Sequence, residues 1–167
     1  MKIEVTTTKT NKKDATKYIL RKIPLVSKVS QFNNIIGDVH LEYIEFKILK
    51  YEIISKYKSN NFFRKELKKD SITMIVNTQN GHSESIDKIP LTSKKYVSKT
   101  RIKRTKIKDD DIIIGVKNEI IKYLKKKINK DDKEKVTIQD ISVTEIKSIY
   151  KPYWVAEFRG RNIYIEA

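Results

Sequence analysis

The sequence predicts an α+β protein made of two similar halves, each of which packs a helix on a hairpin-rich antiparallel sheet. Three observations lead to this fold class. Apolar residues recur at helical spacing in residues 14–23 and again in the segment that begins at Asp109. Alternating apolar and polar residues, which are typical of strands, follow each of these segments. Turn residues of the kind that close hairpins, above all Asn80-Gly81, separate several of the strands.

The first half is predicted to run from one or two helices into a sheet. A helix over residues 14–23 carries apolar residues on one face, and Asn11 or Asp14 would cap its first turn. Pro24 either ends that helix or begins a second one, for which Gly37 is the natural stop. The other predicted elements are a short strand or frayed end over residues 1–10, a second helix over 24–36, a strand or bent strand pair over 39–57, a charged connector or short helix over 60–70, a strand over 71–78 and a polar edge strand over 82–87.

The clearest helix of the sequence begins after the basic run that ends at Lys108. Three aspartates from Asp109 lie at its start and three lysines from Lys125 lie at its end, so both runs complement the helix dipole. A charged loop over 129–135 and a strand region over 136–149 should follow. The predicted buried face of the helix consists of Ile113, Val116, Ile120, Leu124 and Ile128.

The C-terminal segment is predicted to form a hairpin that contains Trp154, the only tryptophan of the chain. One strand would cover residues 153–158 and would have Pro152 at its start, where the missing N–H harms a ladder least. Gly160 would take a positive φ in the turn, and residues 163–165 would return as the second strand.

Aromatic and basic residues are concentrated in the same C-terminal segment. Trp154 is either a core side chain of the hairpin or part of an aromatic ligand platform with Tyr150 and Tyr153. Together with the arginines of the turn, these residues form a candidate aromatic and basic patch that consists of Tyr150, Tyr153, Trp154, Arg159 and Arg161.

The chain carries a formal net charge of +16, from 37 basic and 21 acidic residues. An excess of this size favours an anionic partner such as nucleic acid or an acidic protein. The basic residues are mostly lysine, and lysine, isoleucine and asparagine share AT-rich codons, so genome composition is an alternative source of part of the charge. No apolar run has the length of a membrane span, and the first residues lack the apolar region of a signal peptide. A cytoplasmic location is therefore expected, with an extracytoplasmic one left open.

The local distribution of charge is more informative than the total. Residues 94–108 contain eight basic residues and no acidic one. They form either a solvated linker or edge strand, in which lysine discourages strand pairing, or an arm that follows a phosphate backbone. In the second case Arg101 and Arg104 would make the strongest contacts. The candidate residues for an anionic partner are Lys94, Lys95, Lys99, Arg101, Lys103, Arg104, Lys106 and Lys108.

Residue combinations that are typical of catalysis are missing from the sequence. The two histidines, His40 and His82, have no second histidine at metal-ligand spacing, and the chain has no cysteine. Four glycines are too few for a phosphate-binding loop, and Ser83 beside Glu84 lacks the glycine pattern of a nucleophile turn. We therefore expect neither an enzyme nor a metal ion or other cofactor.

Two segments resemble the PepSY-like group of small α+β domains. One is the stretch YKPYW at residues 150–154, where the chain enters the C-terminal strand, and the other is the hairpin turn at residues 76–81. The resemblance implies tandem, non-enzymatic modules with inhibitory or binding roles, often outside the cytoplasm. An internal duplication would fit a tandem pair, because residues 42–46 occupy the place that residues 149–153 hold later.

These observations predict a non-catalytic binding or interaction module with an acidic macromolecular partner. A PepSY-like inhibitor or immunity-type protein and a nucleic-acid-binding protein without sequence specificity are the alternatives. The predicted organisation is an N-terminal α+β half over residues 1–90, a basic linker or edge strand over 91–108 and a C-terminal α+β half over 109–167. The sequence makes no prediction of the oligomeric state.

Overall fold

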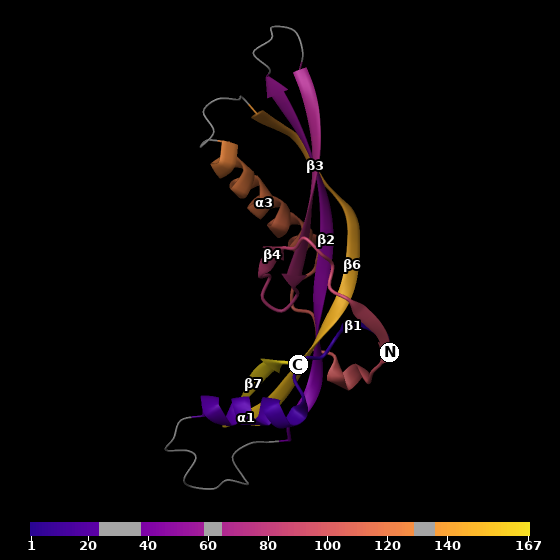
Figure 1. The fold of residues 1–167 in the computed structure, drawn as a ribbon, viewed down its shortest axis with the longest axis vertical. Coiled ribbons are helices and arrows are strands. Elements are labelled where there is room, and N and C mark those ends of the chain that lie inside the picture. The colour runs from indigo at the N-terminus through magenta and orange to yellow at the C-terminus, as the bar shows by residue number, and fades with distance from the viewer. Residues whose placement is uncertain (24–37, 59–64, 129–135) are drawn as a thin grey trace. The chain divides into compact units, whose positions relative to one another are not determined.

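The computed structural model describes residues 1–23, 38–58, 65–128 and 136–167 (Figure 1). The elements in chain order are β1 (Lys2–Thr6), α1 (Lys12–Lys22), β2 (His40–Lys58), β3 (Lys65–Asn77), β4 (Ser83–Ser85), β5 (Thr92–Tyr96), the 3-10 helix η1 (Lys99–Arg101), α3 (Asp109–Ile128), β6 (Val136–Phe158) and β7 (Arg161–Glu166). The strands form one sheet in the order β4-β3-β2-β6-β1-β5, and β7 pairs with β6 off this path. Within the described residues, two α-helices and a mostly antiparallel sheet confirm the α+β class.

The chain forms two compact units, each assembled from distant parts of the sequence. Unit 1 comprises residues 1–45, 90–104 and 149–167, and unit 2 comprises residues 46–89 and 105–148. The long strands β2 and β6 contribute residues to both units. Each unit therefore takes residues from both predicted halves, and the internal duplication stays a prediction.

Unit 1 packs α1 against the C-terminal hairpin of β6 and β7. Of the two predicted caps, Asn11 and Asp14, the structure shows Asn11, whose side-chain oxygen accepts a hydrogen bond from the Asp14 backbone N–H at 2.9 Å. The apolar face of α1 is buried in a cluster that consists of Ile19, Ile23, Val39 and Ala156, with Leu20, Trp154, Phe158, Ile163 and Ile165 packed against it.

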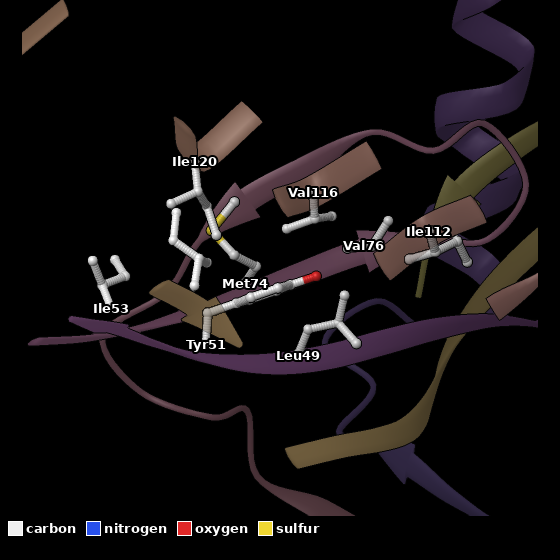
Figure 2. Packing of buried hydrophobic residues seen from close by; sticks show 9 residues of the cluster. Leu49, Tyr51, Ile53, Met74, Val76, Ile112, Val116 and Ile120 are labelled. Atoms are coloured by element: carbon white, nitrogen blue, oxygen red, sulfur yellow. The ribbon is translucent and has the colours of Figure 1, made fainter. Parts of the chain in front are cut away.

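Unit 2 packs α3 on β2 and β3. Figure 2 shows side chains from the two strands and from the helix gathered in one cluster. The helix contributes Ile112, Val116 and Ile120, which are buried and recur every fourth residue. Ile113, which the sequence places on the buried face, is only partly buried beside the cluster. The strands contribute Leu49, Tyr51, Ile53, Met74 and Val76.

β3 is longer than the sequence predicts. β3 begins at Lys65 and pairs with β2 from Lys58↔Lys65 to Phe46↔Asn77. Residues 65–70 are therefore strand rather than connector or helix. For β2 the sequence leaves a strand or a bent strand pair open, and the structure shows one continuous strand. The side chains of residues 66–70 are exposed, and without a buried face they lack the alternation that indicates a strand. The predicted helix over 24–36 and the predicted loop over 129–135 lie outside the described residues.

Pro152 lies inside a strand rather than at its start. β6 runs unbroken from Val136 to Phe158, whereas the sequence predicts a new strand at the proline. The Pro152 carbonyl accepts a hydrogen bond from the Ala167 N–H at 2.9 Å, one residue beyond β7. In antiparallel pairing the N–H and C=O of one residue point to the same side. An N–H at position 152 would therefore point toward Ala167, which is one residue beyond the end of β7. Its absence removes no hydrogen bond between β6 and β7.

Residues with positive φ close both predicted hairpins. Gly81 has a φ of 72° in the turn between β3 and β4, and β4 is an edge strand as predicted. Between β6 and β7, Arg159 and Gly160 have φ values of 50° and 73°. Positive φ at both central residues is the mark of a type I′ turn. The sequence predicts this conformation at Gly160 but not at Arg159, since non-glycine residues rarely adopt it.

Candidate binding surface

β5 lies at one end of the strand order and pairs antiparallel with β1. Beyond the ladder, the Met1 amino group donates to the Val97 carbonyl at 2.8 Å and the Val97 N–H donates to the Met1 carbonyl at 2.9 Å. Alternate residues of an antiparallel strand bond to the same neighbour, so Lys95 also turns its backbone groups toward β1. The outer edge of the sheet therefore carries the backbone N–H and C=O groups of Thr92, Lys94 and Tyr96.

The eight basic residues predicted to bind an anionic partner are divided between the two units. Unit 1 holds Lys94, Lys95, Lys99, Arg101, Lys103 and Arg104, whereas Lys106 and Lys108 belong to unit 2. Among the residues of unit 1, Lys103 turns inward: its ammonium group contacts the Tyr164 hydroxyl and lies 4.1 Å from the centre of the Tyr164 ring.

Three cations of unit 1 lie together in the sequence and have no acidic partner among the described residues. Lys95, Lys99 and Arg101 are exposed, and none of the ion pairs found among the described residues includes them. Lys94 differs from them, because the register places it opposite Glu4 on β1. We call Lys95, Lys99 and Arg101, together with the outer edge of β5, the basic edge.

A pocket of about 390 Å³ lies beside the basic edge, and every described residue that lines it belongs to unit 1. This volume is large enough for an amino-acid side chain or a small ligand. The aromatic lining residues are Tyr43, Tyr96 and Trp154, the cationic ones are Lys12, Lys95 and Arg101, and the others are Asp38, Val39, His40, Leu41, Val97 and Ser98.

The charges that line the pocket leave a positive excess. Asp38 pairs with Lys12 at 3.3 Å, so these two side chains offset each other. His40 is engaged locally, with its Nε2 atom 3.3 Å from a Glu42 carboxylate oxygen. Lys95 and Arg101 remain as cations without a carboxylate partner in the described part of the chain. An anionic group is the ligand that this arrangement favours.

Two of the pocket aromatics lie close to lysines. The Lys95 ammonium is 5.6 Å from the centre of the Tyr43 ring, and the Lys2 ammonium is 5.8 Å from that of Tyr96. Cation–π contacts of this kind contribute about 0.5–1 kcal/mol at exposed sites. Tyr96 nevertheless remains 78% exposed, so most of its ring is open to a ligand.

Trp154 belongs both to the core of unit 1 and to the pocket lining. Its ring packs against the cluster between α1 and the hairpin, and its indole N–H donates to the Thr10 carbonyl at 2.8 Å. It also lines the pocket beside Tyr43. The two interpretations of this residue, core side chain and ligand contact, are therefore compatible with each other.

The predicted aromatic and basic patch does not form one surface. Tyr150 is buried in a cluster with residues of β1. Tyr153 and Trp154 are successive residues of a strand and point to opposite faces. Tyr153 packs edge-on against Tyr164, with 6.4 Å between ring centres. Burial, together with the charge of Glu166, raises the pKa of Tyr153 to about 12. The two remaining members, Arg159 and Arg161, are exposed at the turn.

Several residues of this surface carry no clear signal in the sequence. Lys12 and Tyr43 come from α1 and β2, far along the chain from the basic run, and only the fold brings them to one pocket. Tyr96 follows Lys94 and Lys95 directly, and an aromatic residue inside a basic run is the one pattern that could have drawn attention to it.

Comparison of the chain with protein-family models, with curated proteins and with solved structures finds no match. The resemblance to PepSY-like domains therefore stays a prediction. Across the described ranges, no cluster of three or more acidic or histidine side chains is arranged to hold a metal ion. No helix in these ranges combines the length and the apolar character needed to cross a membrane.

Proposed function

We propose that the chain is a non-catalytic binding module whose unit 1 binds an acidic macromolecular partner at the basic edge. The observation that supports this most strongly is a set of exposed cations without a described carboxylate partner beside an aromatic-lined pocket. Such cations create a positive potential that attracts and orients an anionic partner. The exposed ring of Tyr96 adds apolar contact area, which a purely ionic encounter lacks.

Arg101 is the residue best suited to recognise the anionic group itself. Its planar guanidinium can donate two parallel hydrogen bonds to a carboxylate or phosphate, which a lysine ammonium cannot do. Arg101 and Lys95 both line the pocket, where a bound anion would lose part of its water. Lys99 would act mainly on the rate of encounter, because exposed ion pairs contribute only about 0–1 kcal/mol.

A triple substitution tests the proposal. Replacing Lys95, Lys99 and Arg101 by Gln removes the side-chain charges of the basic edge. The matched control replaces Lys122, Lys125 and Lys126 by Gln, which removes the same charge from exposed positions of α3 in unit 2. Fluorescence anisotropy then measures binding to labelled polyglutamate and to a labelled DNA duplex across a salt series.

We expect the basic-edge variant to lose about tenfold or more in affinity for the polyanion that the native chain binds. The control variant should lose much less, because its lysines are not among the residues that line the pocket. Equal losses in the two variants would show that only net charge matters. Failure of the native chain to bind either polyanion at low salt would contradict the proposed function.

A further inference from the structure

The outer edge of β5 has the geometry of a strand-pairing site. The register with β1 directs the backbone groups of Thr92, Lys94 and Tyr96 outward, and no described strand pairs with this side. Alternate residues of a strand repeat every ~7 Å, and an extended peptide presents complementary N–H and C=O groups at the same repeat. The five residues of β5 therefore offer a short ladder to an added strand.

The lysines of β5 decide which strand can be added. Lysine on an edge strand normally prevents pairing with other strands. Lys94 and Lys95 are successive residues, so they project to opposite faces of the sheet. A basic strand, including β5 of a second copy of this chain, would meet a like charge on each face. An acidic strand would meet an opposite charge on each face, although on the face of Lys94 that charge already lies opposite Glu4 on β1. The charge of the edge therefore favours an acidic strand.

The pocket adds a second element of selection. Lys95 lines it from β5, and Arg101 lines it from η1, a few residues further along the chain. Side chains of an added strand alternate between the two faces, so every second one lies on the face of Lys95. An acidic side chain at such a position would bring its carboxylate to the pocket that both of these cations line.

We propose that β5 binds an extended acidic segment of a partner protein as an additional strand, with one acidic side chain of that segment in the pocket. This inference rests on the proposed function. The backbone bonds provide affinity, and the pocket provides the preference for an acid at alternate positions. Nucleic acid shares the negative charge but lacks peptide N–H and C=O groups at the strand repeat. The outward backbone groups of β5 therefore favour a protein partner.

The test uses the full chain and a short labelled peptide in which Glu alternates with Thr. A second peptide has the same sequence with every backbone nitrogen methylated, which keeps the charge and removes all N–H donors. On the protein, Lys94→Pro removes an outward N–H, and Lys94→Gln removes the same charge but keeps that N–H. The Lys94 N–H points away from β1, so the proline leaves the β1–β5 ladder intact. Circular dichroism of both variants tests whether they are folded.

We expect the methylated peptide to bind at least about tenfold more weakly than its parent, because it loses several hydrogen bonds. Lys94→Pro should bind the parent peptide about fivefold more weakly than Lys94→Gln, the factor expected for one lost hydrogen bond. The parent peptide should also change the fluorescence of Trp154, the only tryptophan of the chain and a pocket residue.

Four outcomes count against the inference. Equal binding of the two peptides, or equal binding by the two Lys94 variants, would overturn strand addition but leave the proposed function intact. Stronger binding of a DNA duplex than of the peptide would assign the basic edge to nucleic acid instead. Absence of binding to the peptide and to the duplex at low salt would overturn both the inference and the proposed function.

Discussion

The hydroxyl of Tyr51 donates a hydrogen bond of 2.8 Å to the backbone carbonyl of Ile113. Tyr51 is fully buried on β2, and Ile113 lies near the start of α3. A buried hydroxyl without a partner would destabilise the fold, and here a helix carbonyl supplies that partner. The bond therefore fixes the helix to the sheet at one defined place in the core of unit 2.

Removing this hydroxyl should lower the stability of the chain. Tyr51→Phe leaves the ring in place and loses the bond, while the Ile113 carbonyl keeps its position in the helix. We expect the free energy of unfolding to fall by about 1 kcal/mol, the net contribution of a typical hydrogen bond. Urea denaturation followed by circular dichroism measures the change. Tyr123→Phe is the control, because that side chain is 60% exposed, and equal stabilities of the two variants would mean that the bond contributes nothing.

Alkaline pH should weaken the fold through two tyrosines. Burial raises the pKa of Tyr51 from 10.0 to about 12, and burial together with Glu166 raises that of Tyr153 to about 12. A group whose pKa is higher in the folded state contributes stability below its unfolded pKa and loses it as the pH rises through the folded value. The free energy of unfolding should therefore fall between pH 10 and pH 12.

Urea titrations across that pH range compare the native chain with the variant in which Tyr51 and Tyr153 are both Phe. The variant should lose less stability over the range, since two of the titrating groups are gone. Replacing the exposed Tyr18 and Tyr123 by Phe provides the control. An equally steep fall in the double variant and in the native chain would refute the assignment to these tyrosines.

The turn between β6 and β7 contains an avoidable strain. Arg159 has a φ of 50°, a conformation that costs a residue with a Cβ atom about 1–2 kcal/mol. Asn tolerates this conformation and is common in type I′ turns, so Arg159→Asn should stabilise the chain by about 0.5–1 kcal/mol. Thermal unfolding measures the shift. Arg161→Asn, at the first residue of β7, should give no such gain, and a similar gain from both would point to charge rather than backbone strain.

Two glycines should respond to alanine in opposite directions. Gly115 lies in the interior of α3, and a Cβ atom there would meet nothing within 4 Å. Gly115→Ala should therefore stabilise the chain by about 1 kcal/mol, the difference in helix propensity. A Cβ atom at Gly160 also meets nothing within 4 Å, but its φ is +73°. Gly160→Ala should destabilise by about 1 kcal/mol or more for conformational reasons alone. The same sign of change at both glycines would contradict this explanation.

Local signals in the sequence were sufficient for the elements that depend on nearby residues. The helix that begins at Asp109, the cap at Asn11 and the turn at Gly81 are all visible in short stretches, and the structure confirms each of them. The same reasoning failed where pairing partners determine the structure. Residues 65–70 are strand because β2 lies opposite them, and Pro152 is tolerated because β7 ends beside it.

The candidate surface was predictable only in part, for a related reason. The basic residues of the run at 94–108 are contiguous in sequence, so their charge was easy to detect. The pocket beside them depends on Tyr43 and Trp154, which come from two other segments of unit 1. Long-range packing determines which side chains line the same pocket. The residue pattern within one segment therefore cannot predict the pocket. Exposure of Tyr96 likewise depends on what the rest of the chain leaves uncovered.

The two roles of Trp154 can be separated by comparing stability with binding. Trp154→Phe keeps a ring against the α1 cluster but loses the bond to the Thr10 carbonyl, so it should cost about 1 kcal/mol of stability. Trp154→Ala also removes the packed ring and should cost more, about 2–4 kcal/mol, since the side chain is only partly buried. Urea denaturation followed by circular dichroism measures both losses.

The same variants should differ when they bind the peptide in which Glu alternates with Thr. Phe preserves an aromatic pocket lining, so Trp154→Phe should retain most of the affinity, whereas Trp154→Ala should lose affinity in conditions where it remains folded. A Trp154→Ala chain with native stability would show that the indole is not part of the core. A folded Trp154→Ala chain that bound the peptide as tightly as the native chain would show that the pocket takes no part in recognition, because removing its largest aromatic residue would then have changed only the fold.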